Sequence, residues 1–161
     1  LILGDFNDRL CLCDWRYRKM RSKIDQRTMN FLQADYTETN SELIKAVVSQ
    51  LSEYFNKERE EFDLPILFTG SEFQNRVWAE TLKVDYGKTV SYSELSKRLG
   101  DEKAVRAVAS ANGANAISII VPCHRILGSQ GELTGYAGGL LTKRKLLELE
   151  GYKKHGQSRL F

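Results

Sequence analysis

Cysteine, histidine and proline are scarce in this chain, which has three, two and two of them among 161 residues. An odd number of cysteines argues against a disulfide framework and for a reducing compartment, so we expect the protein in the cytoplasm, or in the nucleus of a eukaryote. Cys11 and Cys13 lack partners for a zinc site, because His124 and His155 are the only histidines. We predict no metal.

Long hydrophobic runs are also lacking. No segment approaches the roughly 20 apolar residues that a membrane-spanning helix needs, and no signal-peptide pattern precedes the first predicted strand. We therefore expect no membrane partner. Because residue 1 is Leu rather than Met, we also expect that the sequence begins inside a longer natural chain.

Neither sign of charge is in large excess, but the charge is unevenly spread. The chain carries a net +3, with −2 over residues 1–68 and +5 over residues 69–161. If a polyanion binds, this distribution favours the second half. A surplus of this size is also common in proteins that never meet nucleic acid, so charge alone decides little.

The first half begins with the pattern of a β-hairpin. Residues 1–6 and 10–15 are mostly apolar and flank the turn residues Asn7 and Asp8, which predicts two antiparallel strands. Cys11 and Cys13 lie two apart on the second strand and face the same side. Packing within the strand explains these two cysteines better than metal binding.

The rest of the first half predicts a scaffold without chemistry of its own. Residues 16–27 are strongly basic, and we interpret them as a solvated loop. An amphipathic helix follows, capped by Thr39 with Glu42 three residues later, and extends to Phe55. Residues 64–68 then predict a short edge strand.

The second half predicts three helices in succession. Ser71 and Gln74 form a capping box for the first helix, and Ser91 with Glu94 caps the second, which Gly100 ends. A third helix is expected over residues 102–111. A helix, a short glycine-containing turn and a second helix make up the helix-turn-helix pattern.

Small residues surround a single cation, Arg106, in this third helix. One interpretation is a helix packed tightly in a core. The other is close approach to a narrow groove of nucleic acid, where bulky side chains would clash and an arginine could enter. The composition alone favours neither.

Residues 119–125, Ile-Ile-Val-Pro-Cys-His-Arg, carry the strongest chemical signal. The β-branched residues predict a short buried extended segment that Pro122 ends. Cys123 would lie at its exit, where His124 can take the thiol proton and the charge of Arg125 favours a thiolate. A cysteine after an apolar run is more often a buried small hydrophobe, and this segment alone leaves both interpretations open.

Several motifs together resemble the O6-alkylguanine-DNA alkyltransferases. They are Val-Pro-Cys-His-Arg at 121–125, Gly-Tyr-Ala-Gly-Gly at 135–139 and Leu-Leu-Glu-Leu-Glu-Gly at 146–151. The resemblance covers residues 62–152 and, more weakly, the order of elements before them. It implies an α+β fold with a ribonuclease-H-like N-terminal domain (residues 1–68, short antiparallel sheet) and a mostly helical, winged-helix-like DNA-binding domain (residues 69–161).

The resemblance also implies an activity, namely DNA repair by a suicide transfer of an alkyl group from O6 of guanine to Cys123. In this family pattern, His124 activates the thiol through a water and Glu150 orients His124. Tyr92 matches the proton donor to the leaving guanine, and Asn115 matches the asparagine that holds the turn before the active site. No cofactor is implied, since the damaged DNA supplies the alkyl group.

The implied partner is double-stranded DNA, bound through the minor groove by a monomer, with the lesion nucleotide flipped out and Arg106 filling its place. O4-alkylthymine is a possible second substrate. The further residues expected at the DNA are Ala104, Ala107, Ala109, Ser110, Tyr92 and Ser129. The base pocket is expected to comprise Pro122, Arg125, Ile126, Tyr136, Ala137 and Gly138, and the backbone of Cys123, Ile126 and Ala137 would read the base edges.

Two alternative functions belong to other classes. A non-enzymatic lesion-recognition module would keep the arginine and the pocket but lack the cysteine, and the intact Cys123 argues against it. A transcriptional regulator of the adaptive response would need an additional metal-binding domain that these 161 residues do not contain. The basic tail, with Lys153, Lys154, His155 and Arg159, either touches phosphates or is disordered, and the sequence does not decide which.

Overall fold

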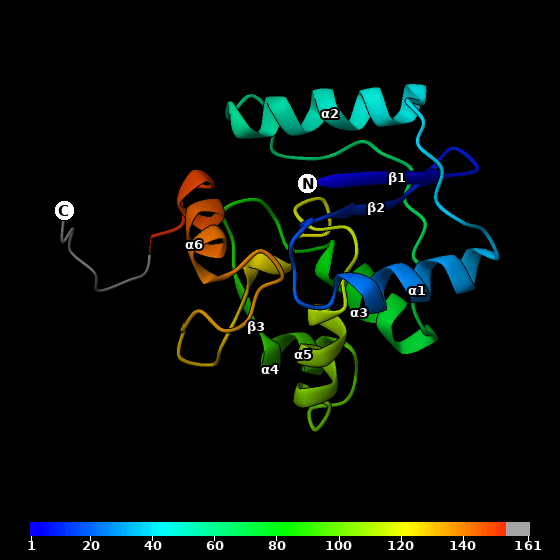
Figure 1. Ribbon diagram of the computed structural model, residues 1–161. Helices are drawn as coiled ribbons and strands as arrows, with labels where there is room; N and C mark the ends of the chain where they lie inside the picture. Colours follow the sequence, from blue (N-terminus) through cyan, green and yellow to red (C-terminus); the bar gives the residue numbers. More distant parts are fainter. Residues whose placement is uncertain (154–161) are drawn as a thin grey trace.

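The computed structural model describes residues 1–153, so the tail residues Lys154, His155 and Arg159 lie outside the described part (Figure 1). The hairpin lies between helices α1 and α2, and α3, α4 and α5 gather on the other side of α1 (Figure 1). The elements are β1 (Ile2–Phe6), β2 (Arg9–Asp14), α1 (Arg21–Leu32), α2 (Glu42–Phe55), α3 (Glu72–Thr81), β3 (Val90–Ser91), α4 (Tyr92–Arg98), α5 (Val105–Gly113), the 3-10 helix η1 (Cys123–Arg125), β4 (Ile126–Leu127) and α6 (Leu140–Leu149). None of these helices is long and apolar enough to cross a membrane.

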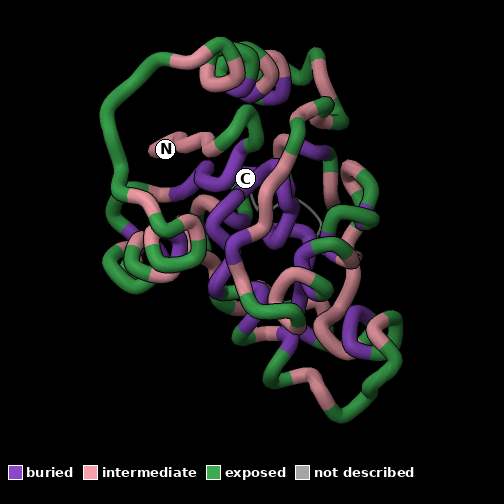
Figure 2. Tube along the Cα trace, turned by 90° about the vertical axis from the view of Figure 1, so that its right-hand side faces the viewer, coloured by how far each residue is buried: buried purple, intermediate pink, exposed green. Residues whose placement is uncertain are grey.

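The predicted hairpin is confirmed. Strands β1 and β2 pair antiparallel from Ile2 opposite Asp14 to Phe6 opposite Arg9. Asn7 and Asp8 have φ angles of 48° and 57°, the left-handed values that a tight hairpin turn requires. Leu10, Leu12 and Cys13 of β2 belong to the central core, and in Figure 2 the buried segments gather in the middle of the molecule while exposed residues lie mostly at its periphery.

The interpretation of residues 16–27 as a loop is wrong, because helix α1 begins within them at Arg21. Two of their cations are paired rather than solvated: Arg18 and Arg21 both bind Asp14 at the end of β2, at 2.9 and 2.7 Å. Ile24 is buried on the inner side of the helix. A run of cations usually indicates a solvated segment, and the helix was missed because two of these cations form ion pairs within the protein instead.

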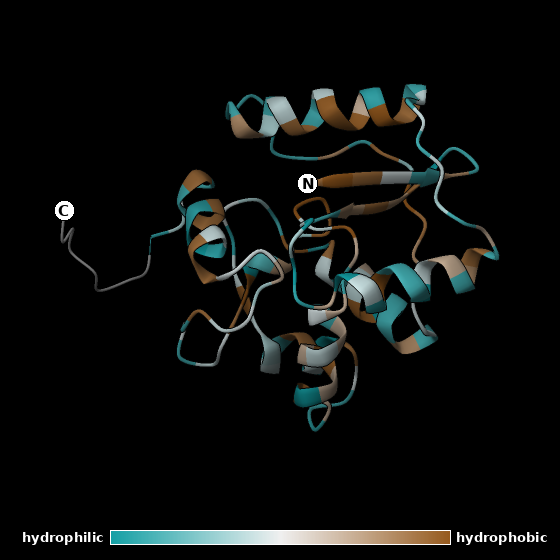
Figure 3. Ribbon diagram, in the orientation of Figure 1, coloured by the Kyte–Doolittle hydropathy of each residue, from teal (hydrophilic) through white to brown (hydrophobic). Residues whose placement is uncertain are grey.

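Helix α2 follows the prediction except at its start. Ser41, not Thr39, is the N-cap, and its Oγ accepts a hydrogen bond from the Ile44 amide at 3.1 Å. One face of the helix is buried at Val47, Leu51 and Tyr54. Apolar and hydrophilic residues alternate along α2 in Figure 3, as expected of a helix with one face on the core.

The predicted edge strand at residues 64–68 is reduced to a single bridge. Leu10 donates its amide hydrogen to Pro65 O at 2.7 Å and accepts one from Leu67 N at 2.8 Å. Ile66 is thereby paired with Leu10 in a parallel sense. Pro65 itself cannot donate to a ladder, which restricts further pairing here.

The helices of the second half are largely as predicted. The Ser71–Gln74 capping box of α3 is present, and Ser91 caps α4 by accepting from Glu94 N. Gly100, with φ 87°, turns the chain after α4. Helix α5 spans Val105–Gly113 rather than residues 102–111, and it packs on both α3 and α4.

The predicted extended segment before Pro122 is wrong. Ile119 has a φ of 72°, and the Val121 amide donates to Ile117 O at 2.9 Å, so the chain makes a tight turn here. The residues before the turn instead extend the hairpin sheet, because Cys13 donates to Ala116 O and accepts from Ser118 N. This pairing holds residues 116–118, which lead into the Pro122–Cys123 segment, against strand β2 of the first half of the chain.

Candidate active site

Cys123 is the first residue of η1 and is only 4% exposed. Burial raises the pKa of its thiol, while a hydrogen bond from Asn115 Nδ2, at 3.3 Å from Sγ, works in the opposite direction. The thiol is therefore protonated in the resting protein at neutral pH. It needs a base before it can act as a nucleophile.

Asn115 holds the two ends of the tight turn together. Its Nδ2 donates to Val121 O at 3.2 Å and Ile117 O at 3.3 Å, and its Oδ1 accepts from the Ile117 amide at 2.9 Å. The same Nδ2 group reaches Cys123 Sγ. Asn115 thus positions both the backbone around the nucleophile and the sulfur itself.

A largely buried hydrogen-bond cluster surrounds the carboxylate of Glu150. His124 Nε2 lies 2.6 Å from Oε1, and Tyr54 donates its hydroxyl to the same oxygen at 2.7 Å. Arg125 donates from Nε to Oε2 at 2.9 Å and from a terminal nitrogen to Oε1 at 3.0 Å, and the Gly87 amide donates to Oε2 at 3.2 Å. Burial alone would raise the pKa of Glu150, but the hydrogen bonds from His124 and Arg125, together with the positive charge of Arg125, lower it to about 2.

The protonation state of His124 follows from these contacts. Burial lowers the pKa of His124, more than the Glu150 carboxylate raises it, so the imidazole is neutral at neutral pH. The carboxylate can only accept, and therefore Nε2 carries the hydrogen and Nδ1 carries the lone pair. Nδ1 is buried and has no hydrogen-bond partner in residues 1–153, which leaves a base next in sequence to Cys123.

The prediction that the charge of Arg125 favours the Cys123 thiolate does not match the position of its side chain. Its guanidinium binds Glu150 and Val84 O instead of facing the sulfur. The cations that lower the pKa of the Cys123 thiol are Lys143 and, more weakly, Arg18. Lys143 is fully buried on α6, and burial lowers its own pKa to about 8.

Lys143 also braces the pocket wall. Its ammonium donates to Ile126 O at 2.6 Å, to Thr134 O at 2.8 Å and to Gly135 O at 3.4 Å. These bonds tie α6 to the segment after η1 and to the loop that follows it. The carbonyl of Ile126, which was predicted to read a base edge, thus already accepts one hydrogen bond from Lys143.

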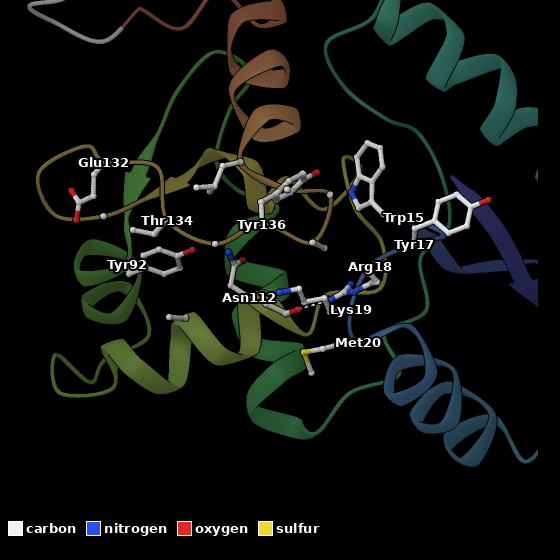
Figure 4. A pocket seen from close by; sticks show the side chains of 18 of the residues that line it. Trp15, Tyr17, Arg18, Lys19, Met20, Tyr92, Asn112, Glu132, Thr134 and Tyr136 are labelled. Carbon is white, nitrogen blue, oxygen red and sulfur yellow. Dashed lines mark hydrogen bonds between the residues drawn. The ribbon is translucent and has the colours of Figure 1, made fainter.

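A cavity of about 1400 Å³ opens beside this cluster (Figure 4). Tyr92, Asn112 and Thr134 line one side, and Tyr136 and Trp15 line another. Of the predicted site residues, Tyr92, Ala109, Ser129, Tyr136, Ala137 and Gly138 contribute to its lining. Cys123 lies behind it, in contact through its carbonyl with Asn112 Nδ2 at 3.5 Å.

The glycine-rich part of the cavity wall packs on the first half of the chain. A Cβ at Gly138 would lie 2.6 Å from Trp15 Cε2, so only glycine permits this approach. The Trp15 and Tyr136 rings meet edge to face with centroids 6.1 Å apart. Trp15 thereby fixes the position of the segment that carries Tyr136, Ala137 and Gly138.

Helix α5 presents the predicted DNA-binding residues. Arg106, Ala107 and Ser110 are exposed, whereas Ala104, just before the helix, and Ala109 are partly exposed. The inner face is buried at Val108, Ala111 and Asn112. The buried side of the helix fits the interpretation of a packed core, and the other side leaves Arg106 exposed, as the groove interpretation requires.

The sequence did not reveal four residues of the site: Tyr54, Lys143, Asn112 and Trp15. Tyr54 lies on the buried face of α2, and because a buried tyrosine hydroxyl needs a hydrogen-bond partner, that requirement was the available signal. Lys143 lies in a basic stretch, residues 142–145, of the kind that is usually exposed, and nothing in the sequence indicated that it is buried. Within residues 1–153, no group of three or more His, Cys, Asp or Glu side chains is placed to hold a metal ion.

Comparisons with known proteins cover both halves of the chain. Residues 72–152 match the family model for the DNA-binding domain of 6-O-methylguanine DNA methyltransferase, and residues 9–68 match the model for its ribonuclease-like domain. These matches confirm the α+β fold with a ribonuclease-like first part and a helical second part.

Individual relatives agree. A methylated-DNA–protein-cysteine methyltransferase of Mycobacterium tuberculosis is 49% identical over 114 residues, 71% of this chain and 69% of the relative. One of Methanosarcina acetivorans is 47% identical over 112 residues, 70% of this chain and 72% of the relative. The crystal structure of M. tuberculosis OGT in complex with DNA superposes with a TM-score of 0.78 at 38% identity, covering 92% of this chain and 84% of that one. The chain belongs to the 6-O-methylguanine DNA methyltransferase family.

Proposed function

We propose that this protein is a methylated-DNA–protein-cysteine methyltransferase that repairs O6-alkylguanine in duplex DNA by moving the alkyl group onto its own Cys123. The observation that carries the proposal is the buried pair of Glu150 and neutral His124, 2.6 Å apart, which leaves Nδ1 of His124 as a base beside a protonated thiol. This is the nucleophile, base and orienting acid of a catalytic triad.

The reaction is a displacement at the alkyl carbon. His124 Nδ1 takes the thiol proton through a bridging water, and the Cys123 sulfur forms a bond to the alkyl carbon as the bond from that carbon to O6 breaks. The electron pair stays on the guanine, and Tyr92, which lines the cavity, donates the proton that neutralises it. The imidazolium that His124 becomes when it takes the thiol proton is stabilised by the Glu150 carboxylate.

The product explains why the protein acts once. A thioether on Cys123 has no leaving group that water can displace, so the alkylated protein is spent. The DNA supplies the transferred group, and no cofactor takes part. Each molecule therefore removes one lesion.

DNA binding rests on α5 and on the cavity. The lesion is hidden inside the duplex stack, and the nucleotide must be flipped out to reach Cys123, at a cost of a few kcal/mol. Arg106, exposed on α5, fills the space that the base leaves, and Ala107 and Ser110 allow close approach to the minor groove. Ser129, Tyr136, Ala137 and Gly138 enclose the flipped base.

The two parts of the chain divide this work in the proposed reaction. Residues 69–161 bind DNA and accept the alkyl group. Residues 1–68 support the site through Asp14, which accepts a hydrogen bond from Ser118 in the turn before Cys123, and through Trp15 and Tyr54. The protein acts as a monomer in the compartment that holds the DNA, the cytoplasm or, in a eukaryote, the nucleus. O4-alkylthymine would be a secondary substrate.

A repair titration tests the proposal. Increasing amounts of a duplex with one O6-methylguanine are incubated with a fixed amount of protein, and the repaired strands are counted. We expect repair to stop at one lesion per protein molecule and to vanish in Cys123→Ala. Continued turnover, or repair by Cys123→Ala, would contradict a transfer to this cysteine.

A further inference from the structure

A loop of the first half of the chain forms part of the cavity wall. Residues 16–20, the rim loop, join β2 to α1, and all five line the cavity. Four of them are exposed, and Tyr17 has 93% of its surface in solvent. Large exposed apolar side chains gather at this cavity, namely Leu1, Tyr17, Met20 and Leu140. Such a group beside a cavity indicates a surface that a partner covers.

Arg18 fixes the rim loop against the end of α5. The side chain is buried, and its guanidinium pairs with Asp14 at 2.9 Å. It also donates to the carbonyl of Gly113, the last residue of α5, and to that of Asn115 at 2.8 Å. Because the middle residue of the loop is held in this way, the exposed side chains on either side of it keep their position relative to α5.

The rim loop carries positive charge that the described part of the protein does not neutralise. Within residues 1–153, neither Arg16 nor Lys19 has a carboxylate at ion-pair distance. The nearest acidic residue in sequence, Asp14, is already shared by Arg18 and Arg21. A phosphate can therefore approach both free cations without competition from a carboxylate.

The rim loop and α5 border the same cavity. Val105, Ala109 and Asn112 of α5 line it, and in Figure 4 Tyr17 and Lys19 lie at the opposite end from Tyr92. In the proposed reaction, a flipped nucleotide in the cavity remains joined to its strand, so the sugar-phosphate chain has to run along the edge of the cavity. DNA bound at α5 therefore brings this strand to the rim loop as well.

We infer that the rim loop is a second DNA-binding surface. Arg16 and Lys19 pair with phosphates of the strand that carries the lesion, and Tyr17 packs on a nucleotide beside the flipped one. Lysine and arginine neutralise phosphates, and aromatic rings stack on exposed bases. The inference rests on the proposed function and adds a contact from residues 1–68 to those of α5.

The salt dependence of binding tests the two cations. Binding of a duplex with one O6-methylguanine is measured at several KCl concentrations, with Cys123→Ala as the parent protein so that no methyl transfer disturbs the equilibrium. The logarithm of the binding constant falls with the logarithm of the salt concentration, with a slope of about 0.9 per phosphate contact. Adding Arg16→Ala and Lys19→Ala removes two contacts, so we expect a slope less steep by about 1.8.

An equal loss of charge elsewhere is the control. Lys45 and Lys57 are exposed on α2 and just after it, and α2 lies on the other side of the hairpin from α5 (Figure 1). Adding Lys45→Ala and Lys57→Ala to the parent should leave the slope unchanged. Tyr17→Ala removes no charge, and it should weaken binding about fivefold or more without changing the slope.

Three results would overturn the inference: an unchanged slope without Arg16 and Lys19, an equal change of slope in the control, or an unchanged affinity in Tyr17→Ala. The proposed function fails in a different way. A wild type that transfers no methyl group from this duplex would contradict it, whatever the slopes.

Discussion

Replacing Glu150 by Gln removes the charge at the centre of the buried cluster while keeping the volume of the side chain. The carboxylate accepts from donors on both oxygens: Tyr54, His124 and Arg125 on Oε1, and Arg125 and Gly87 on Oε2. In either orientation, the new amide group of Gln would face donors. Arg125 would also keep its buried charge without a counterion.

The pKa of Glu150 gives the magnitude. Its fall from 4.5 to about 2 on folding corresponds to about 3 kcal/mol at roughly 1.4 kcal/mol per unit. The side chain is fully buried, so no solvent screening reduces this value. Loss of one partner from a buried ion pair costs a similar amount, about 3–5 kcal/mol. We expect Glu150→Gln to lower the unfolding free energy at pH 7 by about 3 kcal/mol.

The pH dependence gives the same prediction a second readout. The folded-state pKa lies below the unfolded one, so the stabilisation is complete above about 4.5 and is lost as the pH falls toward about 2. Urea unfolding should show this acid loss in the wild type and a smaller one in Glu150→Gln. A variant within about 0.5 kcal/mol of the wild type at pH 7, with the same acid loss, would refute the reasoning.

Three further predictions concern single contacts. Asn115→Ala should lower the unfolding free energy by about 2–3 kcal/mol in urea and slow methyl transfer, since the turn and the Cys123 sulfur lose their common donor; unchanged stability would contradict this role. In thermal melts, Gly138→Ala should destabilise the protein by about 1–3 kcal/mol, because the added Cβ overlaps Trp15. Gly135→Ala is the control and should have little effect, because no atom lies within 4 Å of its added Cβ. Arg106→Ala should slow repair of duplex DNA about tenfold or more but leave the reaction with free O6-methylguanine base nearly unchanged, and equal losses in both assays would argue against a flipping role.

The sequence predicts local elements best where a single residue carries the signal. The turn at Asn7 and Asp8 and the caps at Ser71 and Ser91 are formed as predicted, because each depends on neighbours along the chain. The start of α2 was misplaced because Thr39 and Ser41 both fit a cap, and only Ser41 makes the bond.

Long-range contacts account for most of the errors. Helix α1 was missed because the basic run looked solvated, whereas Arg18 just before the helix and Arg21 at its start pair with Asp14, which lies on the preceding strand. The β-branched residues at 119–121 favour a strand, yet pairing of residues 116–118 with Cys13 forces a turn at Ile119. Only the folded chain shows these partners.

The site divides in the same way. Cys123, His124 and Glu150 were found through motifs that resemble a known family, and the structure joins His124 to Glu150 directly. Tyr54 donates to that carboxylate from 96 residues away, a contact that no local pattern encodes. Arg125 was expected to favour the Cys123 thiolate, but its guanidinium forms an ion pair with Glu150 instead.

The central claim is that Cys123 receives the alkyl group, and mass spectrometry tests it most directly. The protein is incubated with a duplex containing one O6-methylguanine, weighed intact and digested, alongside Cys123→Ala. We predict a gain of one methylene, absent from the variant and confined to the peptide that contains Cys123, with Cys11 and Cys13 unmodified. A methylene on another residue, or tight lesion binding without any gain in mass, would contradict the account.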